Sequence, residues 1–117
     1  MQNIRIKILS VALASFVSIF LSGCSNSDFW IQSNEQNKNI SYRPSDKPNV
    51  AYEFEIKNFV DLDFDGDKRA DRQRLIDNLL KQECPNGGRI LSERSMVAGS
   101  WITGKPIRTY FINVNCK

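Results

Sequence analysis

Apolar and polar residues alternate through the middle of the chain, in the segment 52–64. The apolar residues share one parity, which is interrupted only at Asn58: Tyr52, Phe54, Ile56, Val60, Leu62 and Phe64. A period of two is typical of a β-strand that buries one face. The pattern therefore predicts one long strand, or two strands with a break near Asn58 and Phe59.

The apolar period changes after Asp67. The next apolar residues have the i, i+1, i+4, i+5 spacing of an amphipathic helix: Leu75, Ile76, Leu79 and Leu80. Asp67 is suited to the N-cap of this helix, and the Pro-Asn-Gly-Gly segment 85–88 ends it.

Two further strands are expected after the helix, at about 89–98 and 107–116. In the second, every other residue from Tyr110 to Cys116 is apolar. The loop 99–106, which contains Trp101, joins the two strands as a hairpin. The elements then run β-α-β-β, which predicts an α+β fold with one helix packed on a small antiparallel sheet.

The first 23 residues have a different pattern and are set apart from the fold. Arg5 and Lys7 form a short basic start, and only three of the fourteen residues 8–21 are polar, all of them serines. An apolar core of this length is typical of a secretory signal peptide and is too short to span a membrane. The core ends in Leu21-Ser22-Gly23-Cys24.

This junction resembles the lipobox of bacterial lipoproteins, in which small residues precede a cysteine. The resemblance covers only the signal and its cleavage site. It implies that Cys24 carries acyl chains such as palmitate and becomes the N-terminus once residues 1–23 are removed. Because Ser25 rather than Asp follows Cys24, it also favours the periplasmic face of an outer membrane. In a bacterium with one membrane, the site would be the outer face of the cytoplasmic membrane. The alternative is an ordinary secretory signal in which Cys24 is incidental.

The segment 25–48 is mostly polar, with five Ser, four Asn, two Gln and two Pro. Such a composition is typical of a solvated linker, which the apolar trio Phe29-Trp30-Ile31 interrupts. We therefore expect residues 24–48 to form the acylated cysteine and a flexible tether, and residues 49–117 to form the domain.

Two cysteines remain for a domain of this size once Cys24 is acylated. A core this small usually needs a covalent or metal staple, and disulfides persist in an oxidising compartment. We predict a Cys84–Cys116 disulfide, which would stabilise the fold by roughly 3–4 kcal/mol.

Acidic residues are concentrated in the segment 61–71, where their spacing is compatible with calcium. Ca²⁺ needs several oxygen ligands presented by a curved loop. The spacing D-x-D-x-D-x-x-x-D resembles short calcium loops of extracellular repeat proteins, and its ligands would be Asp63, Asp65, Asp67 and Asp71. An EF-hand-like register would start at Asp61 but would place Arg72 where a Glu is expected. Without calcium, Asp61 and Asp63 would lie on the solvent face of a strand, and Asp65-Gly66-Asp67 would form the turn and cap into the helix.

Charge is divided along the domain. Residues 53–67 carry six acids and one Lys, net −5, whereas residues 68–117 carry ten bases and four acids, net +6. The helix is crowded with Arg69, Arg72 and Arg74. Together with the Trp101 loop, these side chains are candidates for binding another envelope protein or an anionic envelope polymer. The simpler interpretation is a solvated helix face.

The chemistry available to the chain is narrow. It contains no His, which excludes catalysis by an imidazole base, and its three Cys cannot build a four-thiolate zinc site. There is no G-x-S-x-G motif, and no nucleic-acid-binding module is recognisable. We therefore expect a non-enzyme that binds no nucleic acid.

The leading hypothesis is a membrane-anchored envelope module that binds another protein or scaffolds an assembly. Its binding surface would be the Trp101 loop or an open sheet edge. The alternatives are a calcium-binding envelope module and an inhibitor of an envelope-active hydrolase.

Overall fold

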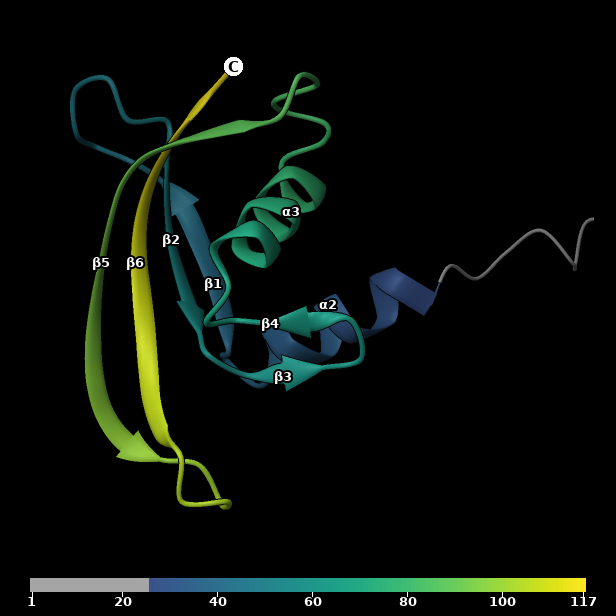
Figure 1. Ribbon diagram of the computed structural model, residues 1–117. Helices are drawn as coiled ribbons and strands as arrows, with labels where there is room; N and C mark the ends of the chain where they lie inside the picture. Colours follow the sequence, from purple (N-terminus) through teal and green to yellow (C-terminus); the bar gives the residue numbers. More distant parts are fainter. Residues whose placement is uncertain (1–25) are drawn as a thin grey trace, which may run out of the picture.

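The computed structural model describes residues 26–117, which form two helices and six strands (Figure 1). In chain order these elements are α2 (Asn26–Gln36), β1 (Ile40–Pro44), β2 (Tyr52–Lys57), β3 (Val60–Asp61), β4 (Phe64–Asp65), α3 (Arg69–Leu79), β5 (Gly88–Ser100) and β6 (Pro106–Cys116). The mixed helix-and-sheet class is as predicted. The order β-α-β-β is incomplete, because it lacks α2, β1 and the β3–β4 pair.

Four strands form one antiparallel sheet in the order β1-β2-β6-β5. The predicted hairpin is β5–β6, and β6 lies at the centre of the sheet between β5 and β2. The outer end of this hairpin extends past the last residue of β2, as Figure 1 shows. β1 and β5 are therefore the two edges of the sheet.

The core lies between one face of the sheet and the two helices. The sheet contributes Ile40, Phe54, Ile56, Ile112 and Val114, and α3 with its following turn contributes Leu75, Ile76, Leu80 and Cys84. The alternation predicted for β2 and β6 and the helical stripe of α3 are both confirmed. Burial of these side chains is the main favourable contribution to folding.

The predicted flexible tether is wrong for residues 26–44. This segment forms α2 and β1, and it buries Ile31 and Ile40 at 6% and 2% exposure. β1 pairs with β2 over five residues, from Ile40 opposite Ile56 to Pro44 opposite Tyr52. The composition of this segment is polar. Its structure depends on the burial of Ile31 and Ile40 and on the pairing of β1 with β2.

Of the two predicted alternatives, the structure has the break near Asn58 and Phe59, because β2 ends at Lys57 and β3 begins at Val60. The Asn58 side chain is buried, and its Oδ1 accepts hydrogen bonds from the Trp101 indole (3.0 Å) and the Arg108 backbone N–H (2.9 Å). Gly66 packs against this turn so closely that a Cβ there would lie 2.3 Å from the Lys57 carbonyl oxygen. Only glycine fits such an approach.

Residues beyond the turn form the short β3–β4 hairpin instead of extending the main sheet. Phe59 and Phe64 are buried, whereas Val60 and Leu62 are 67% and 84% exposed. The prediction that Val60 and Leu62 share the buried face is therefore wrong. Phe64 keeps the predicted parity and is buried, so the alternation fails only within the short hairpin, at Val60 and Leu62.

Candidate functional site

The edge strand β5 has no described neighbour on its outer side. It is 13 residues long and pairs only with β6, whereas the opposite edge, β1, has only five residues. Between two irregularities near its ends, β5 keeps a regular register with β6 from Ser92 to Val97. This stretch presents an ordered strand edge to solvent.

Hydrogen bonding of β6 identifies which backbone groups of β5 point outwards. The carbonyls of Arg108 and Val114 accept from Asn58 and Ala51, each at 2.9 Å, on the β2 side of β6. Residues of the other parity in β6 therefore bond to β5, where their partners are Ser92, Arg94 and Met96. The N–H and C=O groups directed away from the sheet belong to Glu93, Ser95 and Val97.

Side chains along this edge are partly apolar and partly basic. Met96 and Val97 are 56% and 52% exposed. The Arg94 guanidinium lies 4.3 Å from the centroid of the Phe111 ring, and Arg108 donates to the Ser95 hydroxyl at 3.0 Å. A strand that added here would meet two apolar side chains and two arginines.

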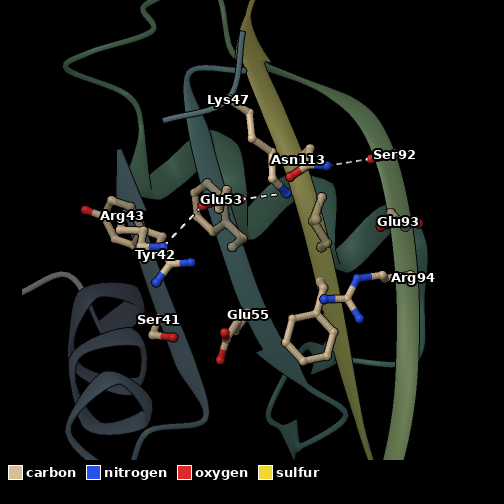
Figure 2. Close-up of a pocket in the computed structure, with 13 residues that line it drawn as sticks. Ser41, Tyr42, Arg43, Lys47, Glu53, Glu55, Ser92, Glu93, Arg94 and Asn113 are labelled. Atoms are coloured by element: carbon tan, nitrogen blue, oxygen red, sulfur yellow. Dashed lines mark hydrogen bonds and ion pairs between the residues drawn. The ribbon is translucent and has the colours of Figure 1, made fainter. Parts of the chain in front are cut away.

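The helix-free face of the sheet continues this surface as a hollow of about 500 Å³. In Figure 2 the Arg43, Glu53 and Asn113 side chains lie in front of the sheet and α3 lies behind it, whereas Glu93 is directed to the α3 side, where it pairs with Arg72. One cross-strand row runs from Arg43 through Glu53 and Asn113 to Ser92, and Asn113 donates to Ser92 at 2.9 Å. The β5 side chains Ser92 and Arg94 line the hollow on its edge-strand side.

Glu53 is the charged centre of the hollow. It pairs with Lys47 at 2.9 Å and with Arg43 at 3.2 Å. Hydrogen bonds from Lys47 and Arg43 hold the pKa of Glu53 below its ordinary value, so the carboxylate is ionised near neutral pH. The hollow thus contains paired opposite charges rather than a uniform field.

The structure does not gather the predicted calcium ligands around one point. Asp65 accepts from the Asp67 backbone N–H at 3.0 Å, and Asp71 accepts from the Asp65 backbone N–H at 2.9 Å. Asp61 accepts from the Asn34 side chain at 3.3 Å, and Asp63 lies exposed at the hairpin tip. Within residues 26–117, no group of three or more acidic or cysteine side chains is placed to hold a metal ion.

Asp67 has a different role from the predicted N-cap. The N-cap of α3 is Lys68, which forms no side-chain cap. The Asp67 carboxylate instead accepts from the Tyr110 hydroxyl (2.8 Å) and the Asn58 amide (3.3 Å), and it pairs with Lys105 (3.0 Å). It thereby joins the start of α3 to β6 and to the loop of the β5–β6 hairpin.

The same contacts predict a pH-dependent contribution to stability. Burial raises the pKa of Asp67, but hydrogen bonds from Tyr110, Lys105 and Asn58 outweigh it, and the net pKa lies below the ordinary value of 3.8. A lowered pKa stabilises the fold above the unfolded-state pKa, and this is lost as the pH falls through the folded-state pKa. We expect Asp67→Asn to be less stable than wild type at pH 7, with a difference that shrinks below about pH 4.

Urea unfolding at a series of pH values measures this difference. Tyr110→Phe is a useful companion, because it removes one of the hydrogen bonds that lower the pKa and should weaken the pH dependence without abolishing it. A wild-type–Asp67→Asn difference that stayed constant from pH 7 to pH 3 would contradict the assigned role.

The predicted basic surface is divided by the structure. Arg72 is buried at 4% exposure, so its assignment to an exposed binding surface is wrong. It belongs to the buried side of α3 because it lies three and four residues before Leu75 and Ile76. Arg69 is exposed, while Arg74 contacts the Asp63 carbonyl and lies 3.4 Å from Asp71. Trp101 is half-buried, with its indole bonded to Asn58.

The predicted cysteine pairing is confirmed. Cys84, after α3, and Cys116, at the end of β6, form a disulfide with their Cα atoms 5.2 Å apart. Cys24 and the signal segment lie outside the described residues. None of the helices among residues 26–117 is long and apolar enough to cross a membrane.

Comparison with known proteins finds no relative of this chain. No protein-family model, curated protein or solved structure matches the chain. The candidate binding surface therefore rests on the geometry of the β5 edge and the hollow beside it.

Residue patterns predicted the β5–β6 hairpin but not the position of β5 at the edge of the sheet. The local signal was the set of apolar residues in β5 that stay exposed: Leu91, Met96 and Val97.

Proposed function

We propose that this protein is a lipid-anchored envelope protein that binds an extended segment of another protein. In this proposal Cys24 carries the lipid, the outer membrane is the location, and the partner's segment adds to the sheet beside β5. The function is non-enzymatic. The observation that carries the proposal is the outward row of backbone groups at Glu93, Ser95 and Val97. Strand addition of this kind derives affinity from main-chain hydrogen bonds and specificity from alternate side chains.

The surroundings of the edge favour a particular partner chemistry. Arg89, Arg94, Lys105 and Arg108 lie on the β5–β6 hairpin, and its one acid, Glu93, is paired with Arg72. An extended segment with acidic residues and an apolar residue opposite Met96 or Val97 would complement this charge and exposed surface.

Blocking the edge tests the proposal. Ser95→Pro removes an outward N–H while leaving the inward groups of β5 free to pair with β6. Ser95→Ala is the matched control, because it also loses the hydrogen bond from Arg108 but keeps the N–H. With a photoreactive residue at position 96 in the native envelope, we expect Ser95→Pro to lose the protein crosslinks that Ser95→Ala retains.

Equal crosslinking by the Pro and Ala variants would refute strand addition at β5. Circular dichroism and thermal unfolding of both variants show whether the fold is intact. If the captured protein is a hydrolase and its activity falls on binding, this protein acts as an inhibitor of that hydrolase.

A further inference from the structure

The helix α2 begins two residues after Cys24, which limits how far a lipid anchor at that cysteine can lie from the domain. Two extended residues span about 7 Å, and the helical rise from Asn26 to Trp30 adds about 6 Å. The Cα atom of Cys24 therefore lies within about 13 Å of that of Trp30. A flexible tether over residues 24–48 would have allowed the domain any orientation relative to the membrane. The short connection from Cys24 to α2 restricts that orientation.

Trp30 fixes α2 to the β3–β4 hairpin. Its ring centroid lies 5.2 Å from that of Phe64 and 6.3 Å from that of Phe59. Asn34, one turn further along α2, donates to Asp61 of β3 at 3.3 Å. The hairpin therefore moves with α2 and stays close to the proposed anchor.

The tip of this hairpin presents an apolar side chain to solvent. Leu62 is 84% exposed and adopts a left-handed backbone with φ of 34°, which L-residues with bulky side chains rarely occupy. Leu62 borders a largely apolar hollow of about 280 Å³ with Trp30, Ile31 and Leu75. Beside it, the half-exposed Arg74 contacts the Asp63 carbonyl. The tip thus presents one exposed apolar side chain, Leu62, beside the exposed acid Asp63 and the Arg74 guanidinium. An apolar side chain next to a guanidinium is a composition found at interfacial membrane contacts.

We infer that the β3–β4 tip, through Leu62 with Arg74 beside it, contacts the phospholipid interface of the membrane that holds Cys24. This inference rests on the proposed lipid anchor and adds the orientation of the domain to it. Because α2 packs by β1 and the sheet order is β1-β2-β6-β5, the β5 edge lies at the far side of the sheet from α2 (Figure 1). The membrane contact and the partner-binding edge are thus separate surfaces.

The two tryptophans of the chain supply an internal test. The lipidated full-length protein is reconstituted into vesicles of phosphatidylethanolamine and phosphatidylglycerol that carry brominated acyl chains, which quench nearby indole fluorescence. We expect Trp101→Phe, which retains only Trp30, to be quenched. We expect Trp30→Phe, which retains only Trp101 in the β5–β6 loop, to keep its fluorescence.

A second substitution tests the tip itself. Leu62→Asn in the Trp101→Phe background removes the apolar group, and asparagine tolerates a left-handed backbone, so the hairpin should fold. We expect this double variant to lose most of the quenching of Trp30 by the brominated lipids. Ile102→Asn, which replaces a fully exposed apolar residue at the end of the β5–β6 hairpin, should leave the quenching unchanged.

The outcomes separate the orientation from the anchor. Protein that fails to float with the vesicles contradicts the lipid anchor. Protein that floats but shows no quenching of Trp30, or the same quenching with and without the Leu62→Asn substitution, contradicts the membrane contact and leaves the anchor standing. Quenching of Trp101 but not of Trp30 would contradict a contact at the β3–β4 tip and would place the β5–β6 loop at the bilayer instead.

Discussion

Replacing Glu93 with Ala is expected to lower the free energy of unfolding by about 3–5 kcal/mol, because it leaves a buried arginine without its carboxylate. Arg72 Nε and Nη2 each lie 3.1 Å from an oxygen of Glu93, and Arg72 Nη1 donates to the Gly66 carbonyl at 2.9 Å. The guanidinium also lies 3.8 Å from the centroid of the Tyr110 ring. The Arg72 and Glu93 side chains are only 5% and 16% exposed, so water cannot replace the lost partner fully.

Urea unfolding of three variants checks this expectation. Glu93→Gln keeps the shape and one acceptor, and it should be less destabilising than Glu93→Ala. Glu53→Ala breaks ion pairs to the well-exposed Arg43 and Lys47, so its effect should be clearly smaller. Similar losses for Glu93→Ala and Glu53→Ala would show that burial of the Arg72 pair adds nothing.

The double variant Arg72→Met, Glu93→Leu separates the ion pair from the packing. Buried ion pairs can often be replaced by apolar residues of similar volume with little loss. We expect this double variant to be more stable than Glu93→Ala alone, because no charge is left unpaired. The comparison tells whether the pair stabilises the fold or mainly fixes how α3 sits on β5.

Strong local patterns predicted the parts of the fold that are organised locally. The alternation in β2 and β6, the stripe of α3 and the two late cysteines each identified their elements correctly. The segment 26–44 could not be predicted in the same way, since its few apolar residues, Ile31 and Ile40 among them, follow no helix or strand period. Their order depends on pairing and packing with residues distant in the chain.

The errors within the candidate site have a related physical cause. Leu62 continues the parity of β2, but the turn at Asn58 and the close approach of Gly66 send it to the surface. Arg72 was assigned by its charge, although its position on the stripe of α3 places it beneath the sheet face. The outward backbone groups of β5 depend on strand order, which no residue pattern encodes directly.

Loss of the Cys84–Cys116 disulfide is expected to cost about 3–4 kcal/mol through the restored entropy of a 33-residue loop. The bond joins the turn after α3 to the end of β6, where the Lys117 N–H also donates to the Gly87 carbonyl at 3.0 Å. Cys84 is buried at 2% exposure, so alanine is a better replacement than serine, which would bury a hydroxyl. The variant to measure is therefore Cys84→Ala, Cys116→Ala.

Reduction of the wild-type protein gives the same comparison without a substitution. Urea unfolding of wild type with dithiothreitol should approach the curve of the double-alanine variant, and the variant itself should not respond to dithiothreitol. Unchanged unfolding of wild type on reduction would contradict a stabilising role for the bond. Small domains have total stabilities of about 5–15 kcal/mol, so a loss of this size would remove a large share of the fold's margin. We therefore expect the domain to depend on an oxidising compartment, and a chain expressed without residues 1–23 in a reducing cytoplasm to unfold at lower urea than the exported protein.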